Sequence, residues 1–170
     1  LYYQGTYHGN NTTVGLFRST NGGTSWSNVA PKIQSQSHYH AVSDIEIDAD
    51  NKLWIGTRKN PYASSSDQGG GRIYYSSNGT SFNESYKNTS ALGGRVEVAC
   101  APSSSDTLYA VIESGGKAQN VVRSFNGGSS WSTFTEPADA DNGIPNTDFT
   151  RGQAWYDLII AVNPVDASEL

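Results

Sequence analysis

A glycine-rich segment that recurs three times constrains the fold of this chain more than any other feature. The copies span Gly15–Trp26, Arg72–Phe82 and Val121–Trp131. In each copy a Ser stands two positions before an Asn, Gly follows the Asn, and an aromatic residue ends the copy. Asn hydrogen-bonds the backbone two residues further on, and Gly accepts a positive φ. Each copy therefore predicts a tight turn between two strands.

A second unit, made of strand, turn and strand, lies between these segments. It spans Ser43–Gly56, recurs at Val96–Val111, and begins a third time at Asp157–Leu170. Apolar and polar residues alternate in the first two copies, which predicts strands with one buried face. The near-continuous apolar run Leu158–Val162 predicts a strand buried on both faces.

The two units together give four strands per period, which is typical of a β-propeller blade. The sequence therefore predicts an all-β fold, a β-propeller segment of about three four-stranded antiparallel blades. We expect a partial blade (its last three strands) with a connecting loop in 1–42, a blade in 43–94, a blade with a long loop in 95–156, and the start of the next blade in 157–170. A two-sheet sandwich is the alternative, but a repeat of blade length favours the propeller.

A propeller closes with roughly four to eight blades, so about three blades leave exposed sheet edges. We therefore expect this chain to be a fragment, and the rest of the propeller to lie in the same parent chain.

The composition agrees with short strands joined by polar turns. Gly, Ser, Thr and Asn make up 68 of the 170 residues, and 16% of the residues are charged. Such a chain does not suit a helical bundle, and its many aromatic residues argue against disorder. The net charge of −5 disfavours nucleic-acid binding, and the absence of a run of 18 apolar residues predicts no membrane span.

The glycine-rich segments resemble the Asp-box (BNR repeat) of sialidase-type propellers, which occurs also in sortilin-type propellers and in xyloglucan-cleaving hydrolases. Asn replaces the usual Asp, and the middle copy is one residue short with Phe in place of Trp. The residues that match are Ser19, Asn21, Gly23 and Trp26, then Ser76, Asn78 and Phe82, then Ser124, Asn126, Gly128 and Trp131. The resemblance implies that these residues are structural, and that a ligand binds on the opposite face of the propeller.

Two further segments, Ser43–Gly56 and Gly152–Pro164, are similar to large secreted proteins of Bacteroidetes-type bacteria that carry a type IX secretion sorting domain. This resemblance implies a secreted or bacterial cell-surface location.

Candidate ligand-binding residues lie in the loops opposite the boxes. His38 and His40 place two imidazoles on one side of an extended segment, where a metal site would need a third ligand; the alternative is two hydrogen-bonding loop histidines. Arg151, Trp155 and Tyr156 combine a cation with aromatic rings of the kind that stack on sugars. Arg58 lies near the same face.

Calcium is the one ion that the sequence suggests, through the spaced carboxylates of 139–143. This segment lacks the distal Glu of a calcium loop, so we expect a solvated turn and no cofactor or metal.

Asp44 and Asp157 are the candidates for catalysis, because they stand at equivalent places before inner strands and glycosidases use paired carboxylates. The sequence as a whole predicts a secreted or cell-surface module that binds carbohydrate or an extracellular protein. The alternative is part of a propeller glycoside hydrolase, either sialidase-like or xyloglucanase-like.

Overall fold

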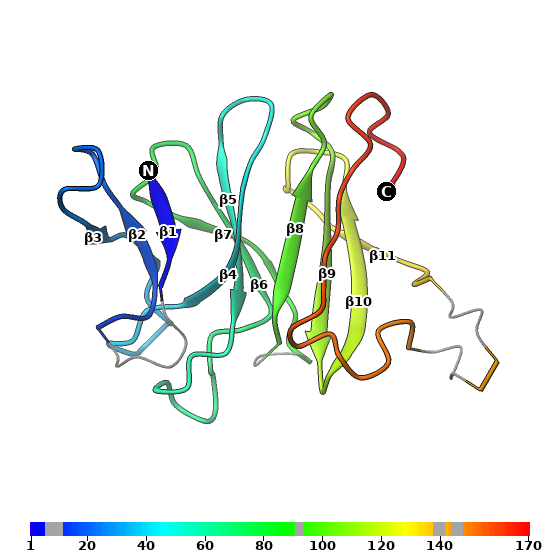
Figure 1. Cartoon of the computed structure of the whole chain (residues 1–170), viewed down its shortest axis with the longest axis horizontal. Coiled ribbons are helices and arrows are strands. Elements are labelled where there is room, and N and C mark those ends of the chain that lie inside the picture. The colour runs from blue at the N-terminus through cyan, green and yellow to red at the C-terminus, as the bar shows by residue number, and fades with distance from the viewer. Residues whose placement is uncertain (6–11, 91–93, 138–141, 144–147) are drawn as a thin grey trace.

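The computed structural model describes residues 1–5, 12–90, 94–137, 142–143 and 148–170. Within these ranges the chain forms eleven β-strands and no helix, so none of the described elements is a helix that could cross a membrane. The strands form three antiparallel sheets that stand side by side (Figure 1). The prediction of an all-β fold is confirmed.

Each sheet is a meander in which strands adjacent in sequence are adjacent in space. The first sheet contains β1 (Tyr2–Gln4), β2 (Leu16–Arg18) and β3 (Ser27–Asn28). The second contains β4 (Ala41–Ile47), β5 (Leu53–Arg58), β6 (Arg72–Ser76) and β7 (Asn83–Lys87), and the third contains β8 (Val96–Cys100), β9 (Leu108–Ser114), β10 (Lys117–Ser124) and β11 (Ser132–Phe134). Successive meanders of up to four strands, packed face to face, are propeller blades.

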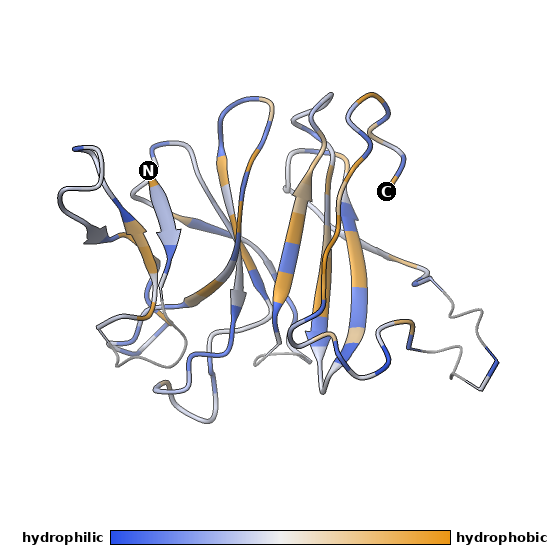
Figure 2. Ribbon diagram, in the orientation of Figure 1, coloured by the Kyte–Doolittle hydropathy of each residue, from blue (hydrophilic) through white to orange (hydrophobic). Residues whose placement is uncertain are grey.

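Apolar side chains pack between the sheets. Figure 2, coloured by hydropathy, shows hydrophobic residues along the strands of each sheet. Trp54 and Ile73 of the second sheet pack against Val96, Val98 and the rest of a fully buried cluster on the third sheet. A second cluster joins Leu16 of the first sheet to the second sheet. Each sheet therefore buries its flat faces against its neighbours, as stacked repeats require.

The three glycine-rich turns share one hydrogen-bond pattern. The hydroxyl of the buried Ser accepts a bond from a glycine N–H: Gly23 to Ser19 (2.8 Å), Gly79 to Ser76 (2.8 Å) and Gly128 to Ser124 (2.9 Å). The Asn side-chain oxygen accepts a bond from the backbone N–H two residues before the next strand, at Ser25, Ser81 and Ser130. The turn that the sequence predicts therefore forms in all three copies, including the copy that is one residue short.

Residues 157–170 differ from the prediction of a strand buried on both faces. They contain no strand, and Ile159 is 89% exposed although Leu158 is buried. The inner strands β4 and β8 each pair with the strand that follows them directly in the chain. The segment 158–162 has no such partner among the described residues, so it packs on the third sheet by alternate side chains alone.

Figure 1 separates the turns into two ends. The glycine-rich turns and the β4–β5 and β8–β9 hairpins lie at the upper end. The 29–40, 58–71, 113–117 and 148–157 segments lie at the lower end, which we call the loop face. Bonds such as Ala154 N–H to Gly116 O (2.8 Å) and Asn60 Nδ2 to Tyr39 O (2.7 Å) join these segments to one another.

Gly56 marks the closest approach between the second and third sheets. A Cβ atom at this position would lie 2.2 Å from the backbone oxygen of Val96, which cannot move without shifting β8. We expect Gly56→Ala to lower the free energy of unfolding by about 2 kcal/mol, the usual cost of overpacking. Urea denaturation measures this change.

Gly115→Ala is the control for this prediction. Gly115 has a φ of +63° but nothing within 4 Å of an added Cβ, so the substitution carries only the left-handed backbone cost of about 1 kcal/mol. Equal losses in the two variants would show that the Val96 contact is not what excludes a side chain at Gly56.

Candidate functional site

The candidate site begins at a β-bulge in the inner strand β4. Val42 pairs with Thr57 and Asp44 pairs with Gly56, so Ser43 is an extra residue without a partner on β5. Bulges redirect side chains, and here Ser43 and Asp44 both reach the neighbouring strand β8. The Ser43 hydroxyl donates to Val96 O (2.7 Å), and Asp44 Oδ2 accepts the Val98 N–H (2.8 Å).

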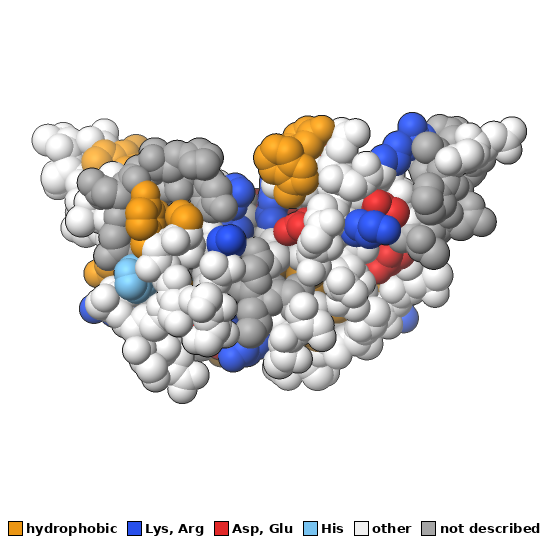
Figure 3. Space-filling view, turned by 90° about the horizontal axis from the view of Figure 1, so that it is seen from below, with side chains coloured by type: hydrophobic (Ala, Val, Ile, Leu, Met, Phe, Trp, Pro, Cys, Tyr) orange, Lys and Arg blue, Asp and Glu red, His pale blue; other side chains and the backbone are white. Residues whose placement is uncertain are grey.

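Four charged residues meet at this junction of β4 and β8, and we call them the inner-strand cluster: Asp44, Arg58, Arg95 and Glu97. Arg95 Nε lies 2.6 Å from Glu97 Oε1. Asp44 and Arg58 lie close enough to influence the ionisation of Glu97. Figure 3, which views the loop face, shows Lys, Arg, Asp and Glu side chains gathered near the middle of this face beside exposed apolar groups.

Burial controls the ionisation of the two acids. It raises the pKa of Glu97 from 4.5 to about 7; the Asp44 charge acts in the same direction, and Arg95 and Arg58 oppose it. Burial also raises the pKa of Asp44, against the two backbone N–H bonds that its carboxylate accepts and the nearby Arg95. Acids with raised pKa values are typical of functional sites, although structural ion pairs show them too.

A short path of hydrogen bonds, which passes through the Glu113 side chain, connects the inner-strand cluster to the loop face. The buried carboxylate of Glu113 accepts the N–H of Arg95 (3.1 Å) and the N–H of Gly116 (2.8 Å). Gly116 in turn accepts the Ala154 N–H (2.8 Å). The residues that follow Ala154 are therefore held beside the turn that supports Arg95.

The aromatic pair Trp155 and Tyr156 follows directly. Their rings meet edge to face with centroids 4.3 Å apart, and they are 57% and 51% exposed. Buried Asp148 supports the turn before them by accepting the N–H of Thr150 (3.2 Å) and of Gly152 (2.9 Å). A large aromatic surface is thus presented on a turn with many internal bonds.

The predicted ligand residues fall into two groups. Arg58 belongs to the inner-strand cluster, and Arg151, Trp155 and Tyr156 lie on the loop face. His40, in contrast, is 1% exposed, and burial lowers its pKa from 6.5 to about 4.

Both ring nitrogens of His40 are engaged, Nδ1 with Gly69 O (2.7 Å) and Nε2 with the Tyr74 hydroxyl (3.0 Å). This arrangement agrees with the alternative of a hydrogen-bonding histidine.

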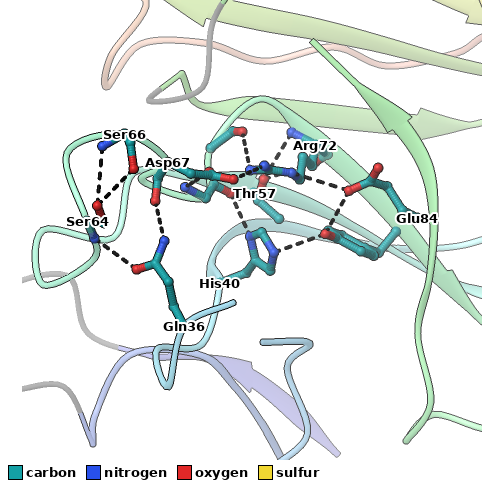
Figure 4. Close-up of polar contacts among 11 residues, drawn as sticks. Gln36, His40, Thr57, Ser64, Ser66, Asp67, Arg72 and Glu84 are labelled. Carbon is teal, nitrogen blue, oxygen red and sulfur yellow. Dashed lines mark hydrogen bonds and ion pairs between the residues drawn. The ribbon is translucent and has the colours of Figure 1, made fainter. Parts of the chain in front are cut away.

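The His40 contacts belong to a buried network under the 58–71 loop (Figure 4). Arg72 is 2% exposed and pairs with Asp67 (2.6 Å) and Glu84 (3.3 Å). The Tyr74 hydroxyl lies 3.0 Å from the same Glu84 carboxylate. These bonds tie the base of the loop to the strands β6 and β7.

A metal site finds no support in the described residues. No group of three His, Cys, Asp or Glu side chains in these ranges could hold a metal ion. His38 is partly buried and its Nδ1 has no hydrogen-bond partner there. Residues 139–141 of the suggested calcium segment lie outside the described residues.

The predicted catalytic residues take different positions. Asp44 belongs to the inner-strand cluster, where its neighbouring acid is Glu97. Asp157 is exposed and lines an open hollow with Arg151, Gln153 and other residues of the loop face. A catalytic role for either residue stays a prediction.

Glu97 and Glu113 are not among the site residues predicted from the sequence, although both lie at the candidate site. The available signal was the alternation of β8, in which Glu97 stands between Val96 and Val98 and so points away from the core. For Glu113 the bond from the Gly116 N–H is local, but the bond from the Arg95 N–H comes from a residue 18 positions earlier, and no local pattern indicates it.

Neither a scan of protein-family models nor a search of curated proteins finds a match. Solved structures similar to this chain include YCF48 bound to D1 peptide, with 11% identity and a TM-score of 0.30, covering 72% of this chain and 47% of that one. YCF48 from Cyanidioschyzon merolae has 13% identity and a TM-score of 0.26, covering 73% and 53%. The match thus spans about half of each solved chain, and the fold assignment here rests on strand order and blade packing.

The raised pKa of Glu97 predicts a pH dependence of stability. Between pH 4.5 and about 7 the folded protein keeps a proton that the unfolded chain releases. The contribution of Glu97 to the free energy of unfolding is therefore fully present below pH 4.5. It is lost as the pH rises to 7, and the loss is up to roughly 3 kcal/mol. Urea unfolding at several pH values should show this loss as a difference between wild type and Glu97→Gln.

Comparing wild type with Glu97→Gln cancels the contributions of the other titrating groups, because both proteins contain them. His40 has a lowered pKa and contributes the opposite slope, but it does so equally in both proteins. Parallel stability curves for wild type and variant would contradict the assignment to Glu97.

Proposed function

We propose that this propeller segment is a protein-binding module whose partner docks on the loop face. The observation that carries the proposal is the exposed Trp155–Tyr156 pair, set on a well-bonded turn next to the inner-strand cluster. Trp, Tyr and Arg are the residue types most enriched at protein-binding hot spots.

Preorganisation supports the same conclusion. Arg95 and Glu97 are held by their 2.6 Å ion pair, and Asp44 is held by two backbone N–H groups. A partner that meets these groups orders few side chains on binding, which lowers the entropic cost of association. Charges of both signs side by side suit a polypeptide, which carries both, better than a neutral glycan.

The proposal includes an extracellular setting. The resemblance of the glycine-rich turns to Asp-boxes and of two strand segments to secreted Bacteroidetes proteins supports a secreted or cell-surface module. In Asp-box propellers the ligand face is the one opposite the boxes, and the loop face has this position here (Figure 1).

Trp155→Ala tests the docking surface. Peptides selected from a random display library on the wild-type protein should bind this variant about 30-fold more weakly, the loss typical of a truncated hot spot. Fluorescence anisotropy with the selected peptides measures the change. Phe125→Ala is the matched control, because Phe125 is 55% exposed but belongs to a glycine-rich turn at the opposite end.

Two results would count against protein binding. One is a failure to select any peptide, and the other is an equal effect of the two substitutions. Binding to a glycan array that Trp155→Ala abolishes, without peptide binding, would favour a carbohydrate ligand instead.

One observation favours a second candidate function, glycoside hydrolysis. Glu97 has a pKa of about 7 and lies beside Asp44, so at neutral pH it holds a proton part of the time, as a general acid must. Release of reducing sugar from a polysaccharide panel, lost in Glu97→Gln but kept in Asp157→Asn, would support this candidate. No release by the wild-type protein would count against it.

A further inference from the structure

Arg95, in the inner-strand cluster, uses only part of its guanidinium within the protein. Its Nε donates to Glu97 Oε1 (2.6 Å), and its Nη1 and Nη2 make no hydrogen bond with the described residues. Among those residues, His38 Nδ1 is the one buried side-chain nitrogen or oxygen that lacks a hydrogen-bond partner. The unbonded Nη1 and Nη2 of Arg95 therefore reach the surface. We call the pair of N–H groups that they present the Nη edge.

The backbone of Arg95 is fixed independently of its side chain. The buried Glu113 carboxylate accepts the Arg95 N–H (3.1 Å), and the Glu113 N–H donates to Arg95 O (2.8 Å). Glu97 holds the guanidinium from one side, and 18% of the Arg95 side chain remains exposed. A long side chain that is ordered before binding loses less conformational entropy when a partner contacts it. The Nη edge is thus preorganised for a ligand.

The Nη edge lies within reach of a partner that docks on Trp155. The Glu113 carboxylate that bonds the Arg95 N–H also accepts the Gly116 N–H (2.8 Å), and Gly116 O accepts the Ala154 N–H (2.8 Å). Three hydrogen bonds therefore link Arg95 to the residue before Trp155. A standard interface buries about 800 Å² on each partner and is roughly 30 Å across, so one partner can cover both places.

The exposed charges of the loop face, which Figure 3 views, are mostly positive. The exposed cations of its described segments are Lys32, Lys117 and Arg151. Asp157 is the one exposed acid described there, because the other acids of these segments bond internally; they are Asp67, Glu113 and Asp148. This balance differs from the net charge of −5 of the whole chain. Complementarity of charge therefore favours an acidic partner on the loop face.

We propose that the partner places the carboxylate of an aspartate or glutamate side chain on the Nη edge of Arg95. This inference rests on the proposed function, the docking of a protein on the loop face. A carboxylate accepts two parallel N–H bonds from a guanidinium edge, and such paired contacts are stronger than neutral hydrogen bonds. Glu97 is a positioning residue for this contact, because it engages Nε and leaves Nη1 and Nη2 open.

The charge of Glu97 sets how strongly the Nη edge attracts an anion. An ionised Glu97 neutralises Arg95, whereas a protonated Glu97 leaves the positive charge of Arg95 uncompensated. The other charged groups that act on Glu97 are Asp44 of β4 and Arg58 of β5, and Glu113 of β9 bonds the Arg95 backbone. Glu97 has a pKa of about 7, so it takes up a proton as the pH falls through 7. A partner carboxylate therefore binds more strongly at the lower pH.

Synthetic peptides with amidated C-termini, taken from the selection on the wild-type protein, test the contact. They should share an aspartate or glutamate, and its replacement by Asn or Gln should weaken binding about 10-fold, the loss typical of a hydrogen bond to a charged group. Arg95→Gln should weaken the acidic peptides equally and should not distinguish them from the neutral versions. Arg123→Gln is the matched control, because Arg123 is exposed but precedes the glycine-rich turn at the opposite end.

The pH dependence of binding tests the role of Glu97. For peptides without histidine, the dissociation constant on the wild-type protein should rise up to about 10-fold from pH 6 to pH 8, which is the fall in the protonated fraction of a group with a pKa of about 7. Glu97→Gln carries no charge at either pH, so it should bind at both with the affinity of the wild type at pH 6. Fluorescence anisotropy measures all of these constants.

A failure of docking and a failure of this contact give different results. If no peptide binds the wild-type protein, docking itself is contradicted, and the contact with it. If peptides bind and Trp155→Ala weakens them, but replacing their acid has the same effect on wild type and Arg95→Gln, docking stands and the contact is overturned. Selected peptides rich in Lys and Arg that bind more tightly at pH 8 than at pH 6 also overturn it, because Glu97 would then receive the partner's charge.

Discussion

Close packing between successive sheets is the constraint on which the rest of this structure depends. A four-stranded meander is too thin to have a core of its own, so its apolar residues are buried only against the next sheet. The third sheet approaches the second so closely that the Val96 oxygen occupies the space of a Gly56 side chain. Ser43 and Asp44 secure this contact with bonds to the backbone of β8.

The same contact creates the candidate site. Asp44 is held at the sheet junction by the β4 bulge, and β8 brings Glu97 and Arg95 beside it. Burial removes hydration from the Glu97 carboxylate, and the nearby Asp44 charge adds repulsion, which is why the pKa of Glu97 rises. The same small group of residues therefore holds the second and third sheets together and sets the charge of the candidate site.

The loop face depends on buried polar bonds rather than on strands. One network, at the base of the 58–71 loop, contains His40, Tyr74, Arg72 and Glu84. In a second, the Glu113 carboxylate joins Arg95 to Gly116, whose carbonyl accepts the Ala154 N–H. Each buried donor or acceptor in these networks would cost free energy if it lost its partner. The networks thus give long polar loops a defined shape on which exposed aromatic residues can be presented.

The sequence by itself determined the features that depend on neighbours along the chain. Ser19, Ser76 and Ser124 with their asparagines predict the turns, and alternation around Ile45 and Val98 predicts strands, because turn bonds and strand faces are local. The repeat period then predicts blades. It does not decide pairing for Leu158–Val162, which has the composition of a strand but forms no ladder among the described residues.

Only the tertiary structure decided which side chains meet. His40 resembles a loop ligand in the sequence, but it is buried because Gly69 and Tyr74, about thirty residues away, surround it. Glu97 becomes a neighbour of Asp44 because two inner strands from different blades lie side by side. Contacts of this kind depend on sheet packing and bulge position, which a repeat in the sequence does not specify.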